Sequence, residues 1–118
     1  MDRFTLKRRA NAVEMIREAE YLDAVFLQYY FNKHDHPFWG GLPRITIEEA
    51  FKAYDQAKFA NCLQQAVRLL AASTSVGEAG CHSTEAHQQA ISAMKEGNPG
   101  FSEACYAKVV ALGWSAMH

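Results

Sequence analysis

Histidines and cysteines in two short stretches are the side chains most able to bind a metal ion. Imidazole and thiolate are ligands that zinc prefers in proteins. The first stretch, residues 33–45, reads KHDHPFWGGLPRI, and the second, residues 73–83, reads STSVGEAGCHS. The spacing matches no C-x₂-C pair and no H-E-x-x-H helix, so these are weak candidates and we expect no cofactor. The candidate ligands in these stretches are His34, His36, Cys81 and His82, and His87 lies shortly after the second stretch.

Cys81 is also a candidate nucleophile, because it precedes an expected helix and has His82 beside it. The N-terminus of a helix favours the thiolate form of a cysteine, and His82 or His87 would act as the base. The sequence contains no paired-carboxylate helix motif, no phosphate-binding glycine-rich loop and no G-x-S-x-G turn. A metal- or thiol-dependent enzyme is therefore an alternative function, and we expect that the protein is not an enzyme.

The predicted binding site lies in residues 33–45, where two aromatic residues precede two glycines. Trp and Arg are favoured anchors at protein interfaces, and glycine allows another backbone to approach closely. The other interpretation is that the two aromatic side chains fold back against the end of the helices. The residues predicted to contact a partner are Phe38, Trp39 and Arg44, supported by Tyr30 and Phe31.

A basic N-terminal segment could contact phosphate groups. Its basic residues are Arg3, Lys7, Arg8 and Arg9, with Arg17 further along. Glu14, Glu18 and Glu20 follow closely and would repel a nucleic-acid backbone. The stretches between the expected helices are also too long for a helix-turn-helix. A nucleic-acid accessory protein is thus a second alternative, and a solvated helix end is the simpler interpretation.

The whole chain has the size and composition of one globular domain, residues 1–118. It has 118 residues, of which 49% are hydrophobic, with 12 Lys and Arg against 13 Asp and Glu. The balanced charge argues against nonspecific binding to nucleic acid or membranes. Three cysteines are an odd number for a secreted disulfide framework, and no apolar run is long enough to span a membrane. We therefore expect a cytoplasmic protein.

Helical periodicity predicts two long helices in the first part of the chain. Residues 5–32 have apolar side chains at alternating spacings of three and four. These are Ala12, Met15, Ala19, Leu22, Phe26 and Tyr29. Residues 47–72 begin after Thr46, which forms an expected capping box with Glu49. The apolar face changes phase along this second stretch, and we expect a straight helix rather than a kink near residues 55–58.

Two shorter helices are expected in the remainder of the chain. Residues 73–83 are small, polar and contain glycine, which predicts a loop. The third helix starts with Ser83 or Thr84 as its cap and ends near Gly97. The fourth helix starts at Asn98 and Pro99. The predicted fold is therefore all-α, an irregular four-helix bundle with two long helices followed by two shorter ones.

The first helix has more apolar side chains than one buried face requires. The additional ones are Val25, Leu27, Tyr30 and Phe31. Such a surplus marks a partner surface or a homo-oligomer contact, or it is buried within a small bundle. Together with the missing catalytic motifs, it favours a small protein-binding module that occupies the surface of another protein. Small helical proteins without catalytic motifs include the inhibitors and adaptors that mobile elements encode, and we expect a role of that kind by analogy with this class.

Overall fold

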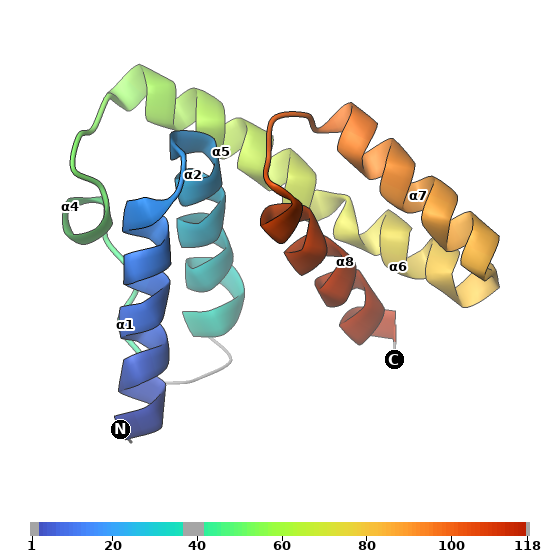
Figure 1. Cartoon of the computed structure of the whole chain (residues 1–118), viewed down its shortest axis with the longest axis horizontal. Helices are drawn as coiled ribbons and strands as arrows, with labels where there is room; N and C mark the ends of the chain where they lie inside the picture. Colours follow the sequence, from blue (N-terminus) through green and yellow to red (C-terminus); the bar gives the residue numbers. More distant parts are fainter. Residues whose placement is uncertain (1–2, 37–41, 118) are drawn as a thin grey trace. The chain divides into compact units, whose positions relative to one another are not determined.

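The computed structural model describes residues 3–36 and 42–117, and every regular element in these ranges is helical (Figure 1). The all-α prediction is confirmed. Within these ranges six helices have ten residues or more, beside a short helix and a π-helical turn. The elements are α1 (Arg3–Glu18), α2 (Tyr21–Tyr30), η1 (Phe31–Asp35), α4 (Ile47–Ala50), α5 (Gln56–Ala71), α6 (Ser73–His82), α7 (Thr84–Gly97) and α8 (Glu103–Met117). The four-helix arrangement is wrong, because both expected long helices are interrupted and an expected loop is helical.

The chain divides into two compact units, Met1–Ala66 and Val67–His118, and α5 contributes residues to both. We call them unit 1 and unit 2 and describe each by itself. The expectation of a single domain stays a prediction. Among the described residues, none of the helices combines the length and the apolar character needed to cross a membrane.

In unit 1 the chain reverses direction between α1 and α2, so that the two helices lie side by side (Figure 1). Glu20 has an extended conformation at the reversal, with φ −58° and ψ 154°. A continuous helix over residues 5–32 is therefore wrong. The reversal packs Val13 and Ile16 against Ala24 in one buried cluster. Because the phase of the apolar face is set by this packing, Met15 is 51% exposed rather than buried.

The C-terminal end of α2 continues into η1, a wider helical turn. Such π-helical turns insert an extra residue and often occur at functional sites. Phe31 lies at the start of η1 and is buried in the same cluster as Ile16. The side chains of Asn32 and His36 both bond the backbone of residues 42–46. The wider turn therefore places two polar side chains against an extended segment.

The expected long helix over residues 47–72 is broken after one turn. The capping box of Thr46 and Glu49 is confirmed, and it starts α4. Phe51 then has an extended conformation, with φ −111° and ψ 126°, and ends that helix. Asp55 caps the next helix, since its Oδ1 accepts a hydrogen bond from the Lys58 N–H at 2.9 Å. The phase change in the apolar pattern therefore marks a break between two helices.

In unit 2 the expected loop over residues 73–83 is the helix α6, and both α7 and α8 pack along it. A Cβ atom built on Gly77 would lie 2.3 Å from the Gly113 carbonyl oxygen. One built on Gly113 would lie 2.3 Å from the Ser73 carbonyl oxygen. The small residues that suggested a loop instead form the surface on which α8 packs, and only glycine fits at these two positions.

The expected start of α7 is confirmed, whereas that of α8 is wrong. Ser83 caps α7, because its Oγ accepts a hydrogen bond from the Ala86 N–H at 2.9 Å, and the helix ends at Gly97. Residues 98–102 then form a turn in which Gly100 has a φ of 98°. The Tyr106 hydroxyl donates a hydrogen bond to the Asn98 carbonyl at 2.6 Å. This bond ties the turn to α8, which begins at Glu103 rather than at the proline.

Candidate functional site

Of the five predicted partner-binding residues, the structure describes three, Tyr30, Phe31 and Arg44. Phe38 and Trp39 lie outside the described residues. Arg44 is exposed, and Tyr30 is half-buried with its ring centroid 5.2 Å from that of His34. Burial raises the pKa of Tyr30, and the charge of nearby Asp35 adds to this effect. Phe31 is only 4% exposed and belongs to the core of unit 1, so it does not present its side chain to a partner.

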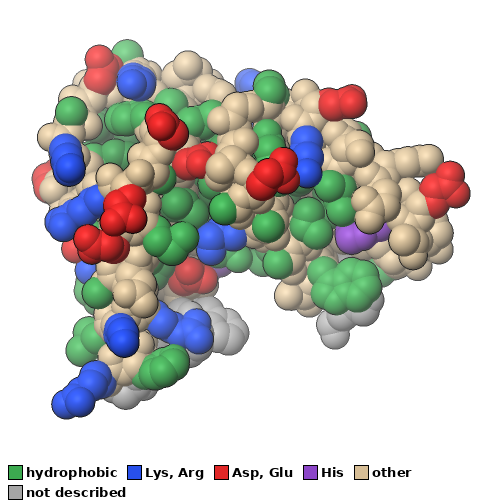
Figure 2. Space-filling view, viewed as in Figure 1, with side chains coloured by type: hydrophobic (Ala, Val, Ile, Leu, Met, Phe, Trp, Pro, Cys, Tyr) green, Lys and Arg blue, Asp and Glu red, His purple; other side chains and the backbone are tan. Residues whose placement is uncertain are grey.

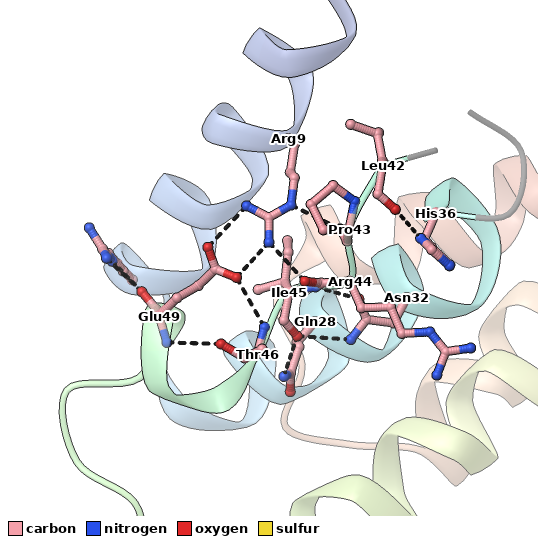
Figure 3. Close-up of polar contacts among 11 residues, drawn as sticks. Arg9, Gln28, Asn32, His36, Leu42, Pro43, Arg44, Ile45, Thr46 and Glu49 are labelled. Atoms are coloured by element: carbon pink, nitrogen blue, oxygen red, sulfur yellow. Dashed lines mark hydrogen bonds and ion pairs between the residues drawn. The ribbon is translucent and has the colours of Figure 1, made fainter. Parts of the chain in front are cut away.

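The Arg9 side chain on α1 bonds residues 43–49, and we call this set of contacts the clamp (Figure 3). Its guanidinium donates hydrogen bonds to both carboxylate oxygens of Glu49, at 3.0 and 2.5 Å. The same group donates to the carbonyl oxygens of Pro43 and Arg44, at 2.9 and 2.8 Å. The hydrogen bond from Arg9 lowers the pKa of Glu49, although partial burial opposes this. Arg17 adds two bonds to the Glu49 carbonyl, at 2.9 and 2.6 Å.

Side chains of α2 and η1 hold the same segment from the other side (Figure 3). The Gln28 and Asn32 side-chain amides each donate to the Ile45 carbonyl at 3.0 Å. The Oδ1 atom of the Asn32 side chain accepts a hydrogen bond from the Ile45 N–H at 2.8 Å. His36 bonds the Leu42 carbonyl oxygen through Nδ1. Since Leu42 and Ile45 are each 1% exposed, these bonds satisfy a backbone that is anchored by buried side chains.

The basic N-terminal residues therefore have at least two different roles. Arg9 and Arg17 bond carboxylate and carbonyl oxygens within unit 1. Arg3, Lys7 and Arg8 are exposed, and the Arg8 guanidinium lies 5.6 Å from the centre of the Phe4 ring. The interpretation as a solvated helix end is thus incomplete, because the sequence pattern did not show that two of the five cations hold the fold.

The candidate metal ligands do not gather in the described part of the chain. No group of three or more His, Cys, Asp or Glu side chains within residues 3–36 and 42–117 is arranged to hold a metal ion. His34 lies in η1, where burial lowers its pKa and the charge of Lys33 adds to this effect. His82 ends α6.

The premise for Cys81 as a nucleophile is wrong. Its thiol is exposed, but it lies in the last turn of α6 and not in a loop before a helix. The two other cysteines, Cys62 and Cys105, are buried and form no disulfide.

A groove lies between α7 and α8 in unit 2, and Figure 2 shows hydrophobic side chains exposed over these two helices. It has a volume of about 520 Å³, which falls in the usual range of ligand sites. Most of its lining is apolar, with a few polar groups. The lining residues are His87, Ile91, Lys95, Glu103, Tyr106, Ala107, Val110, Ala111, Trp114 and Ser115.

Two contacts between α7 and α8 lie at the two ends of the groove, on either side of its apolar middle. At one end the Lys95 Nζ lies 2.9 Å from a Glu103 carboxylate oxygen. The Glu103 side chain is 80% exposed, so this ion pair is screened and contributes little to stability. At the other end the ring centroids of His87 and Trp114 are 6.0 Å apart. Trp114 is 48% exposed, which leaves a large aromatic surface in water.

His87, which lines the groove, also packs against α6. A Cβ atom built on Gly80 would lie 3.1 Å from the His87 ring, so the imidazole packs directly on that glycine. The His87 Nε2 atom is buried and has no hydrogen-bond partner among the described residues. The groove thus offers apolar and aromatic surface of the kind that receives apolar side chains, with charged groups at one end.

Sequence reasoning missed this groove, although one signal for it was present. Tyr106, Val110 and Trp114 lie beside the main apolar stripe of α8, on a second helical face. An α-helix that packs on one neighbour needs only one such face. A second apolar face on α8 was therefore the available indication of a further binding surface.

Comparisons of the chain with protein-family models, with curated proteins and with solved structures found no match.

Proposed function

We propose that the protein is a binding module that holds an apolar helix of another protein in the groove between α7 and α8. The observation that supports this most directly is the exposed Trp114 at the edge of an apolar groove. Trp is strongly enriched among the residues that dominate binding energies. An exposed apolar surface of this kind on a small protein commonly marks a site of protein contact.

The length of the groove favours a helix over a compact small molecule. Its lining follows α8 from Glu103 to Trp114, which are about 16 Å apart along a helix axis. On α7 the lining recurs every fourth residue, at His87, Ile91 and Lys95. A partner helix presents apolar side chains at matching intervals of three, four and seven residues. Three turns of such a helix have the length of this lining.

This proposal retains the predicted function and changes its location. Of the predicted site residues, Arg44 and Tyr30 belong to unit 1 and do not line the groove. We propose that such a module acts as an inhibitor or adaptor in the cytoplasm, because the groove offers a surface for binding. The partner then supplies any catalytic activity.

Selection from a random library of helical peptides tests the proposal with a defined probe. The full-length protein is immobilised and enriched peptides are titrated by fluorescence anisotropy. We expect peptides with an apolar stripe to bind wild type and to bind Ala111→Trp at least tenfold more weakly, since the indole fills the groove. Ala104→Trp is the matched control, because Ala104 is an exposed residue of α8 outside the lining.

Two outcomes would contradict the proposal. In one, no peptide is enriched above a blank surface. In the other, the enriched peptides bind both variants as tightly as wild type, which would place them elsewhere on the molecule. Far-UV circular dichroism melting curves of both variants are recorded first, so that lost binding is attributed to the groove only in a folded protein.

A further inference from the structure

The first helix has an apolar and basic strip that unit 1 leaves exposed. Phe4 is 71% exposed and Met15 is 51% exposed. Residues at positions 4, 8, 11 and 15 share one side of a helix, so Arg8 and Asn11 lie between these two apolar side chains. We call Phe4, Arg8, Asn11 and Met15 the α1 strip. Figure 2 shows hydrophobic and basic side chains exposed together over the N-terminal part of α1.

The α1 strip matches the groove in length. Phe4 and Met15 are about 16 Å apart along the helix axis, as are Glu103 and Trp114 on α8. The apolar anchors of the strip, Phe4 and Met15, stand eleven residues apart at its two ends, with the polar side chains of Arg8 and Asn11 between them.

The charges of the two surfaces are complementary. Of the five basic residues of α1, Arg9 and Arg17 bond Glu49 within unit 1, whereas Arg3, Lys7 and Arg8 are exposed. Residues 69–118 contain two lysines against four glutamates, and one of these, Glu103, lies in the groove. Glu103 pairs with Lys95, but its side chain remains 80% exposed, so a basic helix that approaches the groove meets an accessible carboxylate at one end, which aids both orientation and the rate of association.

We propose that the groove of one copy of the protein binds the α1 strip of a second copy. This inference rests on the proposed function, in that the groove must accept a helix, and it names the class of helix as basic and amphipathic. A contact of this kind joins two different surfaces. Two copies that exchange helices reciprocally form a closed dimer, whereas a one-way contact continues from copy to copy.

Complementary variants test the proposal in sedimentation velocity experiments over a range of concentrations. Phe4→Ser removes the main anchor of the strip but keeps the groove, and Ala111→Trp fills the groove but keeps the strip. We expect each variant alone to associate at least tenfold more weakly than wild type. We expect an equimolar mixture of the two to form a one-to-one complex, because each supplies the surface that the other lacks.

Two matched controls locate the contact. Leu6→Ser changes another exposed apolar residue of α1, 51% exposed, on a different side of the helix. Ala104→Trp changes α8 outside the groove. Both are expected to associate like wild type, and added salt is expected to weaken association, since opposite charges are brought together.

Three results would overturn the inference. Wild type that stays monomeric up to millimolar concentration excludes self-association, while the peptide selection still decides separately whether the groove binds a helix. A mixture of the two variants that forms no complex excludes contact between strip and groove. If Leu6→Ser and Phe4→Ser weaken self-association equally, the contact does not depend on the side of α1 that carries the strip.

Discussion

A single methyl group at Gly77 is expected to destabilise unit 2, because α6 and α8 cross at two facing glycines. The Cβ atom of Gly77→Ala would lie 2.3 Å from the Gly113 carbonyl oxygen, whereas ordinary contacts begin at 3.4 Å. The obstacle is backbone and not a flexible side chain, so the two helices must move apart by about 1 Å. A gap of that size forfeits up to about half of the dispersion attraction between the atoms that separate.

The expected loss in the free energy of unfolding is about 2 kcal/mol. Overpacking of a well-packed contact costs roughly 1 to 3 kcal/mol, and a backbone obstacle at 2.3 Å places Gly77→Ala at the upper end of that range. The better helix propensity of alanine offsets at most about 1 kcal/mol of the cost. For a chain of this length, a loss of about 2 kcal/mol lowers the melting temperature by roughly 8 °C. Urea unfolding and thermal melting followed by circular dichroism measure both quantities.

Two other glycines provide a graded comparison. At Gly80 the nearest obstacle is the His87 side chain at 3.1 Å, which can shift, so a smaller loss is expected for Gly80→Ala. At Gly97 nothing lies within 4 Å of a built Cβ atom, so Gly97→Ala is expected to be neutral or to stabilise by up to about 1 kcal/mol. If Gly77→Ala melts at or above the temperature of wild type, the close crossing is refuted.

Three further predictions concern unit 1 and the thiols. Because the pKa of Glu49 is lowered in the folded protein, its contribution to stability is present above the ordinary glutamate pKa and is lost as pH falls through the lowered value. Urea midpoints measured from pH 7 to pH 2 should therefore fall less steeply for Arg9→Ala than for wild type; parallel curves would argue against the clamp. Asn32→Ala removes two hydrogen bonds to the buried Ile45 backbone and is expected to cost about 2 kcal/mol in urea unfolding, whereas a change below about 0.5 kcal/mol would mean that water replaces them. Titration with a thiol reagent should modify Cys81 rapidly in the folded protein and all three cysteines after denaturation, and fast reaction of a second thiol without denaturant would contradict the burial of the others.

Two helix starts were predicted correctly, because the capping residues that determine them can be recognised in a short stretch of sequence. Thr46 and Ser83 cap helices as expected, because a side-chain oxygen three residues before a free N–H acts without help from the rest of the fold. The reversal at Glu20 has no such signal, since no glycine or proline marks it. It follows from packing α1 on α2, which a sequence window does not show.

The error at residues 73–83 has a more specific cause. Small residues favour loops in an isolated sequence, but they also let two helix backbones approach closely. Gly113, 36 positions after Gly77, is the residue that distinguishes the two cases, because it faces α6 in the fold. The groove was not predicted for a related reason: α7 and α8, which line it, were expected, but α6, the helix along which both of them pack, was expected to be a loop.

The clamp on residues 43–49 also has a consequence for the order of events during synthesis. Arg9 precedes its partner Glu49 by 40 positions. A ribosome adds about 5 to 20 residues each second, so roughly 2 to 8 s pass between the two residues. Once Glu18 has been added, the nascent chain contains all of α1 but still lacks Ile45 and Ala50, which share a buried cluster with its Val13 and Ile16. Until those residues have been synthesised, the N-terminal helix lacks partners that cover its apolar side chains in the folded protein.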